Sequence, residues 1–295
     1  MNSLPERDPY RLDPATARRR SESTAHSYDR SALVYREQTD RLIEHLDPVK
    51  IDPATVVDIG SATGHSTRTL SARFPRALVC GIDWARARLA LAQKTAPRTY
   101  IRKARQRFVC ADAHRLPLAR ASVDAVIAAG VPSSTNNLSG LYLELARVLR
   151  PGALLAFAAF GPDTLMELRG CWDEVDADRS QPPTRCHRFI DMHDQGDSLQ
   201  RCGFGGIVMD AEKLTLTYEN IDALLREIRN LGDTNATAAR PAGLTHPRRL
   251  ERLRSAYEKH RTCDGRLPLT FELVYAHAWR SERPVHESSI PIELA

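Results

Sequence analysis

The stretch Val56-Val57-Asp58-Ile59-Gly60-Ser61-Ala62-Thr63-Gly64 joins a short apolar run to a turn that contains two glycines. An apolar run of this length, rich in β-branched residues and beginning at Thr55, predicts a buried strand. A glycine turn at the carboxyl end of a first parallel strand lets the backbone approach a ligand closely. The turn is weak evidence by itself, because any parallel sheet needs tight connections between strands and helices.

Strand-like and helix-like segments alternate after this turn, which indicates parallel crossover units. Further strands are predicted at 77–82, 108–110, 123–129, 153–160, 207–218 and 271–279. Helices are predicted at 31–46, 66–73, 84–95, 138–149, 191–202, 220–231 and 247–260. The expected fold class is α/β, with a doubly wound, mostly parallel, Rossmann-like sheet of seven strands and helical additions.

The chain is expected to divide into an arm, one domain and a tail. Residues 1–24 lack apolar periodicity, which predicts a flexible arm. Residues 25–285 are expected to form a single domain, with residues 286–295 as the tail. Within that domain, 51–160 would be the ligand-binding core, and 161–285 would supply substrate-side additions and the last strands.

Composition narrows the class of protein. Hydrophobic residues make up 42% of the 295 residues and charged residues 27%, which is ordinary for a globular domain. No apolar stretch reaches the roughly 20 residues that a membrane span needs, and no apolar run follows the N-terminus as in a secretory signal. The six cysteines form no C-x-x-C pair, so we expect no metal knuckle and a reducing cytoplasm.

The net charge of +5 comes largely from arginine, in clusters at 18–20, 86–107 and 248–254. These clusters are read either as solvated helix faces or as a surface that attracts an acidic partner. Nucleic acid is not favoured as that partner, because no binding motif is present and few aromatic residues lie among the charges.

Acidic residues stand at the ends of the next two predicted strands. Asp83 can accept hydrogen bonds from ribose hydroxyls, or can cap the following helix. Asp112 can accept from an adenine amino group, or can serve as a turn residue, and Trp84 can pack on an adenine face or on a helix. The spacing from Gly60 to Gly64 is shorter than in G-x-G-x-x-G, which argues against a dinucleotide.

With R-V-L-R-P-G at 147–152, these strand ends resemble the class I S-adenosylmethionine-dependent methyltransferases over about 51–160. The resemblance implies S-adenosylmethionine as cofactor and a methyltransferase domain. It places Asp58, Gly60 and Gly64 around the methionine part, Asp83 on the ribose and Asp112 on the adenine. The further cofactor contacts that we expect are Ser61, Trp84, Ala113 and Ala129.

A closer resemblance lies outside this core. It rests on A-x-x-Y-D (25–29), F-G-P-D-T-L-M-E-L-R (160–169), H-R-F-I-D-M-H-D-Q-G-D (187–197), V-M-D-A-E-K-L-T-L-T-Y (208–218), N-A-T-A (235–238) and F-E-L-V-Y-A-H-A-W (271–279). These stretches look like the malonyl-acyl-carrier-protein O-methyltransferases of biotin synthesis. The resemblance implies methylation of the free carboxyl of a malonyl thioester, carried by an acidic acyl-carrier protein.

This chemistry needs little catalytic equipment, because a carboxylate is already a nucleophile and a sulfonium is already a good leaving group. A cation should grip one carboxylate oxygen, and arginine suits that role. The candidates are Arg169 first and Arg188 second, with Tyr28 and His193 as further substrate-side residues. Their structural alternatives are surface salt bridges, core packing and a helix N-terminal position. Cys186, His187 and His193 lack a fourth partner for a metal, so no metal is expected.

Two departures from the family keep alternatives open. Ala62 stands where the family's turn usually has its middle glycine, so a methyl group occupies a place where backbone should approach the cofactor. The segment A-G-V-P-S-S-T-N-N at 129–137 replaces the usual Asn-Leu and Gln-Trp pairs. A methyltransferase for another carboxylate or small molecule, and a cofactor-binding homologue without turnover, are the competing hypotheses.

Overall fold

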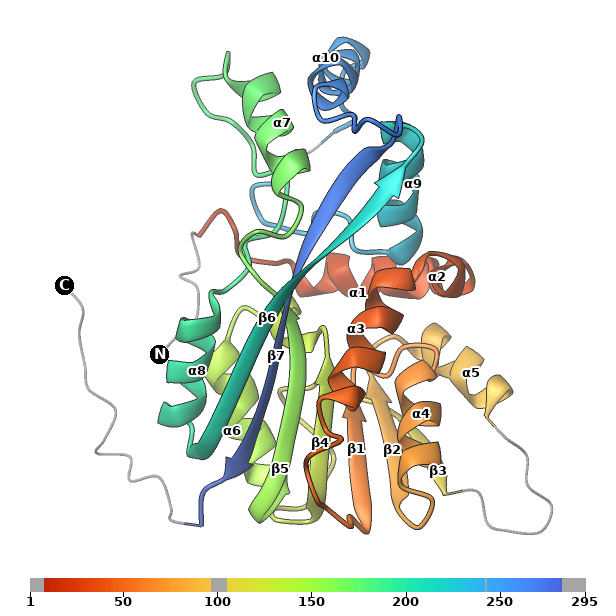
Figure 1. The fold of residues 1–295 in the computed structure, drawn as a ribbon, viewed down its shortest axis with the longest axis vertical. Coiled ribbons are helices and arrows are strands. Elements are labelled where there is room, and N and C mark those ends of the chain that lie inside the picture. The colour runs from red at the N-terminus through yellow and green to blue at the C-terminus, as the bar shows by residue number, and fades with distance from the viewer. Residues whose placement is uncertain (1–7, 97–104, 242, 283–295) are drawn as a thin grey trace.

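The computed structural model describes residues 8–96, 105–241 and 243–282, through which a seven-stranded sheet runs (Figure 1). The strand order is β3-β2-β1-β4-β5-β7-β6, with β1 to β5 parallel and β7 antiparallel to both of its neighbours. The strands are β1 (Thr55–Ile59), β2 (Leu78–Asp83), β3 (Gln106–Cys110), β4 (Val123–Ala129), β5 (Leu149–Phe160), β6 (Phe204–Tyr218) and β7 (Leu267–Arg280). The predicted α/β class and the mostly parallel seven-stranded sheet are confirmed.

All seven predicted helices are present with ends shifted by a few residues. They are α3 (Leu33–Glu44), α4 (His65–Arg73), α5 (Arg86–Thr95), α6 (Leu138–Val148), α8 (Met192–Arg201), α9 (Ile221–Leu231) and α10 (Pro247–Glu258). The sequence did not predict α1 (Pro14–Ser23), α2 (Ala25–Ser31), α7 (Met166–Asp176) or the short 3-10 helix η1 (Val131–Ser134). None of the helices in the described residues has the length and apolar content that crossing a bilayer requires.

Helices cover both faces of the parallel part of the sheet. Successive side chains of a strand point to opposite faces, so Val56 and Val57 enter different clusters of buried residues. Val56 shares its cluster with Leu42 of α3 and Leu70 of α4, and Val57 shares the other with Leu141 of α6. This two-sided burial explains why the strands read as continuous apolar runs.

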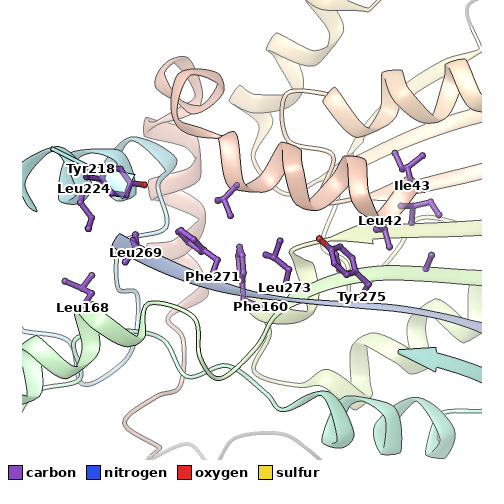
Figure 2. Close-up of a cluster of buried hydrophobic side chains, with 14 of the residues drawn as sticks. Leu42, Ile43, Phe160, Leu168, Tyr218, Leu224, Leu269, Phe271, Leu273 and Tyr275 are labelled. Atoms are coloured by element: carbon purple, nitrogen blue, oxygen red, sulfur yellow. The ribbon is translucent and has the colours of Figure 1, made fainter. Parts of the chain in front are cut away.

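The antiparallel pair of β6 and β7, connected through α9 and α10, extends well beyond the other strands, and α7, α9 and α10 lie around its far end (Figure 1). Figure 2 shows how Leu168 of α7 and Leu224 of α9 lie near Leu269 and Phe271 of β7. Phe160, at the end of β5, belongs to the same cluster and joins this extension to the sheet. The extension is therefore built on the same core as the parallel strands.

Helix α1 lies inside 1–24, where the sequence predicts a flexible arm. That expectation is wrong for 14–23, and the cause is a long-range contact. The carboxylate of Glu22 accepts hydrogen bonds from the backbone amides of Arg86 and Ala87, both at 2.7 Å. These amides are at the N-terminus of α5, where helix amides lack partners of their own. Residues 1–7 and the predicted tail, 286–295, lie outside the described residues.

Strand β5 begins at Leu149 rather than at the predicted residue 153. Val123 of β4 pairs with Leu149, whereas Ala125 pairs with Leu154, so the register shifts between them. The shift leaves β5 with extra residues that have no partner on β4, and Pro151 and Gly152 are among them. A bulge of this kind accommodates residues that would interrupt a regular ladder.

Helix α7 is anchored to β7 through a buried carboxylate, which generates a prediction about stability. Glu167 accepts hydrogen bonds from the Thr270 hydroxyl at 2.5 Å and from the Thr270 amide at 3.0 Å. Substitution Glu167→Ala leaves the Thr270 amide unpaired and the Thr270 hydroxyl with only the Thr215 hydroxyl at 3.3 Å, so the free energy of unfolding in urea should fall by about 1–3 kcal/mol. The control Glu251→Ala removes an exposed partner of Arg254 and should cost less than about 1 kcal/mol. Equal losses would contradict the anchoring role.

Candidate active site

The turn after β1 is fixed from both sides. The carboxylate of Asp58 accepts hydrogen bonds from the hydroxyls of Ser66, at 2.6 Å, and Thr67, both in the first turn of α4. Gly60 has φ +76°, and a Cβ placed on it would lie 2.5 Å from a methyl carbon of Val131. The β1 turn therefore presses directly against η1, which follows β4, and only glycine fits at position 60.

Asp83 connects this turn to the end of β2. One of its carboxylate oxygens accepts from the Ala62 amide at 3.0 Å, and the other accepts from the Ala85 amide at 2.7 Å. Burial raises the pKa of Asp83 above its usual range, while these two amides act in the opposite direction. The carboxylate thus holds both turns in place, and α5 begins at Arg86 rather than at Trp84, where the sequence predicts it.

A pocket, called the first pocket here, opens at the carboxyl ends of the parallel strands. Of the predicted cofactor residues, its wall includes Gly60, Asp83, Trp84, Asp112, Ala113 and Ala129. The other three predicted cofactor residues are Asp58, Ser61 and Gly64, which are buried in the β1 turn and do not line the pocket. These three residues stabilise the end of β1 and its turn, and do not form the surface that faces the pocket.

The first pocket fits a nucleoside that carries an amino-acid side arm. A backbone turn without side chains is available at Gly60, and carboxylates stand at the ends of β2 and β3 in Asp83 and Asp112. The Asp112 side chain is largely exposed and accepts from the His114 amide at 2.9 Å, which leaves its second oxygen available. Such acceptors suit ribose hydroxyls and an adenine amino group.

Figure 1 shows α1 and α2 beyond the carboxyl ends of the parallel strands. Helices α1, α2 and α3 each contribute residues to the wall of the first pocket. Tyr28 of α2 lines it, and the buried guanidinium of Arg88 lies 4.1 Å from the centre of the Tyr28 ring. Arg88 also donates to the Leu231 carbonyl at 2.6 Å. Burial raises the pKa of Tyr28, so its hydroxyl stays protonated. The sequence places Arg88 among solvated charges and missed its role, because its partners lie on α2 and α9.

A second pocket adjoins the first and has largely apolar walls. It lies between the end of β5, α7 and α9, and its aromatic walls include Phe160, Phe189 and Phe271. The residues that line both pockets are Tyr35, Ser134, His187, Asp233 and Thr234. We call these five residues the shared wall. A group transferred from a ligand in the first pocket to one in the second must pass there.

Tyr28 is the one predicted substrate-side residue that lines either pocket. Arg169 lies on α7, half-buried, and donates to the Pro162 carbonyl, whereas its buried Nε has no partner among the described residues. Burial raises the pKa of the Cys186 thiol, which lines the second pocket, and the charge of Arg169 opposes that rise, whereas Arg169 itself is not part of the wall.

Arg188 and His193 lie away from the pockets. Arg188 is exposed, with its guanidinium 5.9 Å from the centre of the Tyr10 ring. The His193 side chain is 84% exposed in the first turn of α8, and its ring contacts the Asp191 carboxylate at 2.9 Å. The structure therefore does not bring these two residues together with Tyr28.

Sequence reasoning did not bring the shared wall together, although His187 lies in the quoted stretch 187–197 and Ser134 in the segment 129–137. The quoted stretch 235–238 directly follows two further members of the wall, Asp233 and Thr234. In the stretch 235–238, Asn235 donates to the Thr184 carbonyl at 2.6 Å, and the Ala236 amide donates to Nε2 of His187 at 3.1 Å. The same loop accepts hydrogen bonds from Arg20 of α1 at the Thr234 and Asn235 carbonyls. The distinctive sequences of these stretches indicated the family, but they carried no information about which pocket the residues would line.

The β1 turn yields a prediction about ligand affinity. Substitution Gly60→Ala combines a strained positive φ with the 2.5 Å contact to Val131, so the turn must move. We expect affinity for S-adenosylhomocysteine, measured by calorimetry, to fall about tenfold or more, since a tenfold loss needs only ~1.4 kcal/mol. Gly170→Ala, where an added Cβ meets no atom within 4 Å, is the control and should bind normally. Unchanged affinity in the Gly60 variant would contradict close approach at the turn.

The buried Asp58 yields a prediction about pH. Burial raises the pKa of Asp58 to about 6, although the Ser66 and Thr67 hydroxyls oppose the rise. The folded protein therefore holds this proton more tightly than the unfolded chain, whose carboxyl titrates near about 4. The resulting stability is complete below pH ~4 and is lost as the pH rises through about 6, by up to ~3 kcal/mol.

Denaturation of the wild type and Asp58→Asn at several pH values measures this effect. The stability of the wild type relative to the variant should decline between pH ~4 and ~6. A relative stability that rises over this interval would show that the carboxylate is preferred in the folded state.

Comparison with known proteins agrees with this geometry. Residues 57–157 match the family model described as a methyltransferase domain. The YcgJ protein of Bacillus subtilis has a similar crystal structure, with a TM-score of 0.58, 14% identity and coverage of 84% of this chain and 99% of that one.

Two curated relatives match over nearly the whole chain, and both are named malonyl-acyl-carrier protein O-methyltransferase. The one from Laribacter hongkongensis is 40% identical over 272 residues, which cover 91% of this chain and 90% of the relative. The one from Halorhodospira halophila is 41% identical over 273 residues, which cover 92% and 90%. The chain therefore belongs to the malonyl-acyl-carrier protein O-methyltransferase family, and S-adenosylmethionine is its methyl donor.

Proposed function

We propose that this methyltransferase esterifies the free carboxyl of malonyl carried on acyl-carrier protein, as a step of biotin synthesis in the cytoplasm. The relatives' names give this substrate for them. The observation that carries the proposal is the apolar second pocket, which meets the cofactor pocket at the shared wall. The six cysteines, all free, are compatible with a reducing compartment.

The reaction requires alignment rather than a base. S-adenosylmethionine, when bound in the first pocket, would supply the methyl group on a sulfonium, which a carboxylate oxygen can accept without any proton having to move. The chain's own task is to hold the oxygen in line with the methyl group and to exclude water.

The shared wall offers hydrogen-bond donors for this alignment. Because Nε2 of His187 accepts the Ala236 amide, a neutral His187 carries its proton on Nδ1. Burial lowers the pKa of His187, which favours this neutral form. The hydroxyl of Ser134 is a second donor on the same wall. We assign Nδ1–H of His187 and the Ser134 hydroxyl to the acceptor's non-reacting oxygen.

The apolar walls of the second pocket suit the arm that links malonyl to its carrier. Phe189, Leu225 and Ile228 provide apolar walls, and Arg229 of α9 lines the same pocket while being exposed. Arg229 makes no side-chain hydrogen bond or ion pair within the described part of the chain. We assign it to the phosphate of the carrier's pantetheine arm, which a guanidinium binds well.

The loop at 129–137 supports a second candidate, methylation of a different carboxylate. Ser133 accepts the Phe160 amide at 2.6 Å, so it holds η1 on the end of β5. Ser134 lines both pockets at a position where the family usually carries a larger side chain. The space gained there would admit an acceptor bulkier than malonyl.

One assay separates these candidates. Release of S-adenosylhomocysteine is measured with malonyl-carrier protein, with malonyl-N-acetylcysteamine and with a longer dicarboxylic thioester on the same carrier. The proposal expects the malonyl carrier to give the highest kcat/KM. Cofactor binding without turnover on either malonyl substrate would overturn it, and preference for the longer acid would support the second candidate.

Arg229, at the second pocket, gives a more specific prediction. Arg229→Ala should raise KM for the malonyl carrier by about threefold or more, as for loss of an exposed ion pair, and should leave the short thioester unaffected. Arg226→Ala, on the same helix but outside the pocket wall, is the matched control. Equal effects on both substrates would contradict a contact with the carrier's arm.

Arg169, the first candidate from the sequence, lines neither pocket, so we propose that it supports the malonyl carboxylate's site through its charge, beside the direct donors His187 and Ser134. Its buried Nε lacks a hydrogen-bond partner among the described residues. The same assay therefore includes Arg169→Ala. This variant should lose turnover on both malonyl substrates while keeping its affinity for S-adenosylhomocysteine. Loss of both properties would mean that Arg169 is structural.

A further inference from the structure

Asp233 occupies a position that the backbone fixes closely. It follows Gly232, which ends α9 with φ +81°. A Cβ on Gly232 would lie 2.4 Å from the hydroxyl of Thr24 and 3.1 Å from the carbonyl of Arg20. The chain therefore leaves α9 in contact with the junction of α1 and α2, and Asp233 comes directly after this contact, on the shared wall.

Tyr35 orients the Asp233 side chain. Its hydroxyl donates to one carboxylate oxygen at 2.5 Å. The ring is held edge-on to Phe160, with centroids 5.4 Å apart, and lies so close to Gly130 that a Cβ there would be 3.0 Å away. Burial and then the charge of Asp233 raise the pKa of Tyr35, so the hydroxyl keeps its proton. This hydrogen bond holds the carboxylate without neutralising it.

No cation of the described residues forms an ion pair with Asp233. The guanidinium of Arg88 is nearby, but it donates to the Leu231 carbonyl and stacks on Tyr28. His187, on the same wall, favours its neutral form. A half-buried carboxylate beside apolar walls is costly unless a positive charge compensates it. The compensating charge can come from a ligand.

The geometry of methyl transfer indicates which positive charge of the ligand compensates Asp233. The methyl group must face the acceptor, so the sulfonium has to lie beside the shared wall. Asp233 is the acidic residue of the described chain that lines both pockets. Asp83 already accepts two amides, and Asp112 stands at the end of β3, which is separated from β1 by β2.

We infer that Asp233, oriented by Tyr35, is the counter-charge of the cofactor's sulfonium and makes the protein bind S-adenosylmethionine more tightly than S-adenosylhomocysteine. The two ligands differ by the transferred methyl group and its positive charge, while both keep the same ammonium and carboxylate. Loss of the sulfonium charge on methyl transfer would thus lower the affinity of the protein for the product, S-adenosylhomocysteine. The inference concerns the cofactor alone and does not depend on which acceptor is methylated.

Calorimetric titration tests this inference with three ligands: S-adenosylmethionine, S-adenosylhomocysteine and sinefungin, in which a charged amine replaces the sulfonium. Asp233→Asn should weaken binding of the two charged ligands about tenfold, the order expected for one close charge pair in a partly buried site. Binding of S-adenosylhomocysteine should change by less than about threefold. The readout is the ratio of the dissociation constants, because a merely structural loss lowers all three affinities together.

Tyr35→Phe provides a second variant, which keeps the ring on Phe160 and removes only the hydroxyl. It should shift the same ratio in the same direction by a smaller factor. An equal loss for all three ligands, or no loss in the Asn variant, would overturn the inference. Because no acceptor is present, these outcomes are independent of the malonyl assays.

Discussion

The carboxylate of Asp83 is the interaction on which the site depends. It accepts one amide from the β1 turn and one from the start of the β2 connection, so two separate segments share one anchor. Burial of this charge is unfavourable, and Asp58 nearby is also acidic and buried. The hydrogen bonds to the charged form offset part of that cost. Without these hydrogen bonds the two turns would no longer be fixed relative to each other, and the first pocket would lose its shape.

Ala62 shows how this chain departs from the usual turn. Its φ is +43°, a left-handed conformation that costs a residue with a Cβ roughly 1–2 kcal/mol. Its methyl group packs in a small cluster with Tyr28, Ala32 and Leu231. The contact ties the β1 turn to α2 and to the end of α9. The alanine thus helps to hold the helical cover on the pocket, in addition to narrowing the approach to the turn.

The sheet and much of the wall of the first pocket could be read from the sequence, because the signals there are local. Apolar runs mark the strands, and parallel strands end at one edge, which brings Asp83 and Asp112 together. Helix α1 could not be predicted, since Glu22 finds its partners 64 and 65 positions away. The same holds for Tyr35 and Asp233, which are 198 positions apart. Arg188 and His193 were chosen from a motif, and a motif does not say which side chains face a pocket.

A carboxylate on the shared wall has a consequence for the order of binding. An anionic acceptor entering the second pocket alone meets Asp233 as a like charge, whereas a bound sulfonium offsets that repulsion. Coupling of this kind is reciprocal, so the acceptor in turn favours the charged cofactor over the spent one. Transfer removes the acceptor's charge and the sulfonium's charge in one step. The neutral ester is then no longer repelled by Asp233, and the cofactor that remains is the form that Asp233 holds least. The same residue thus favours entry of the charged pair and exchange of the spent cofactor.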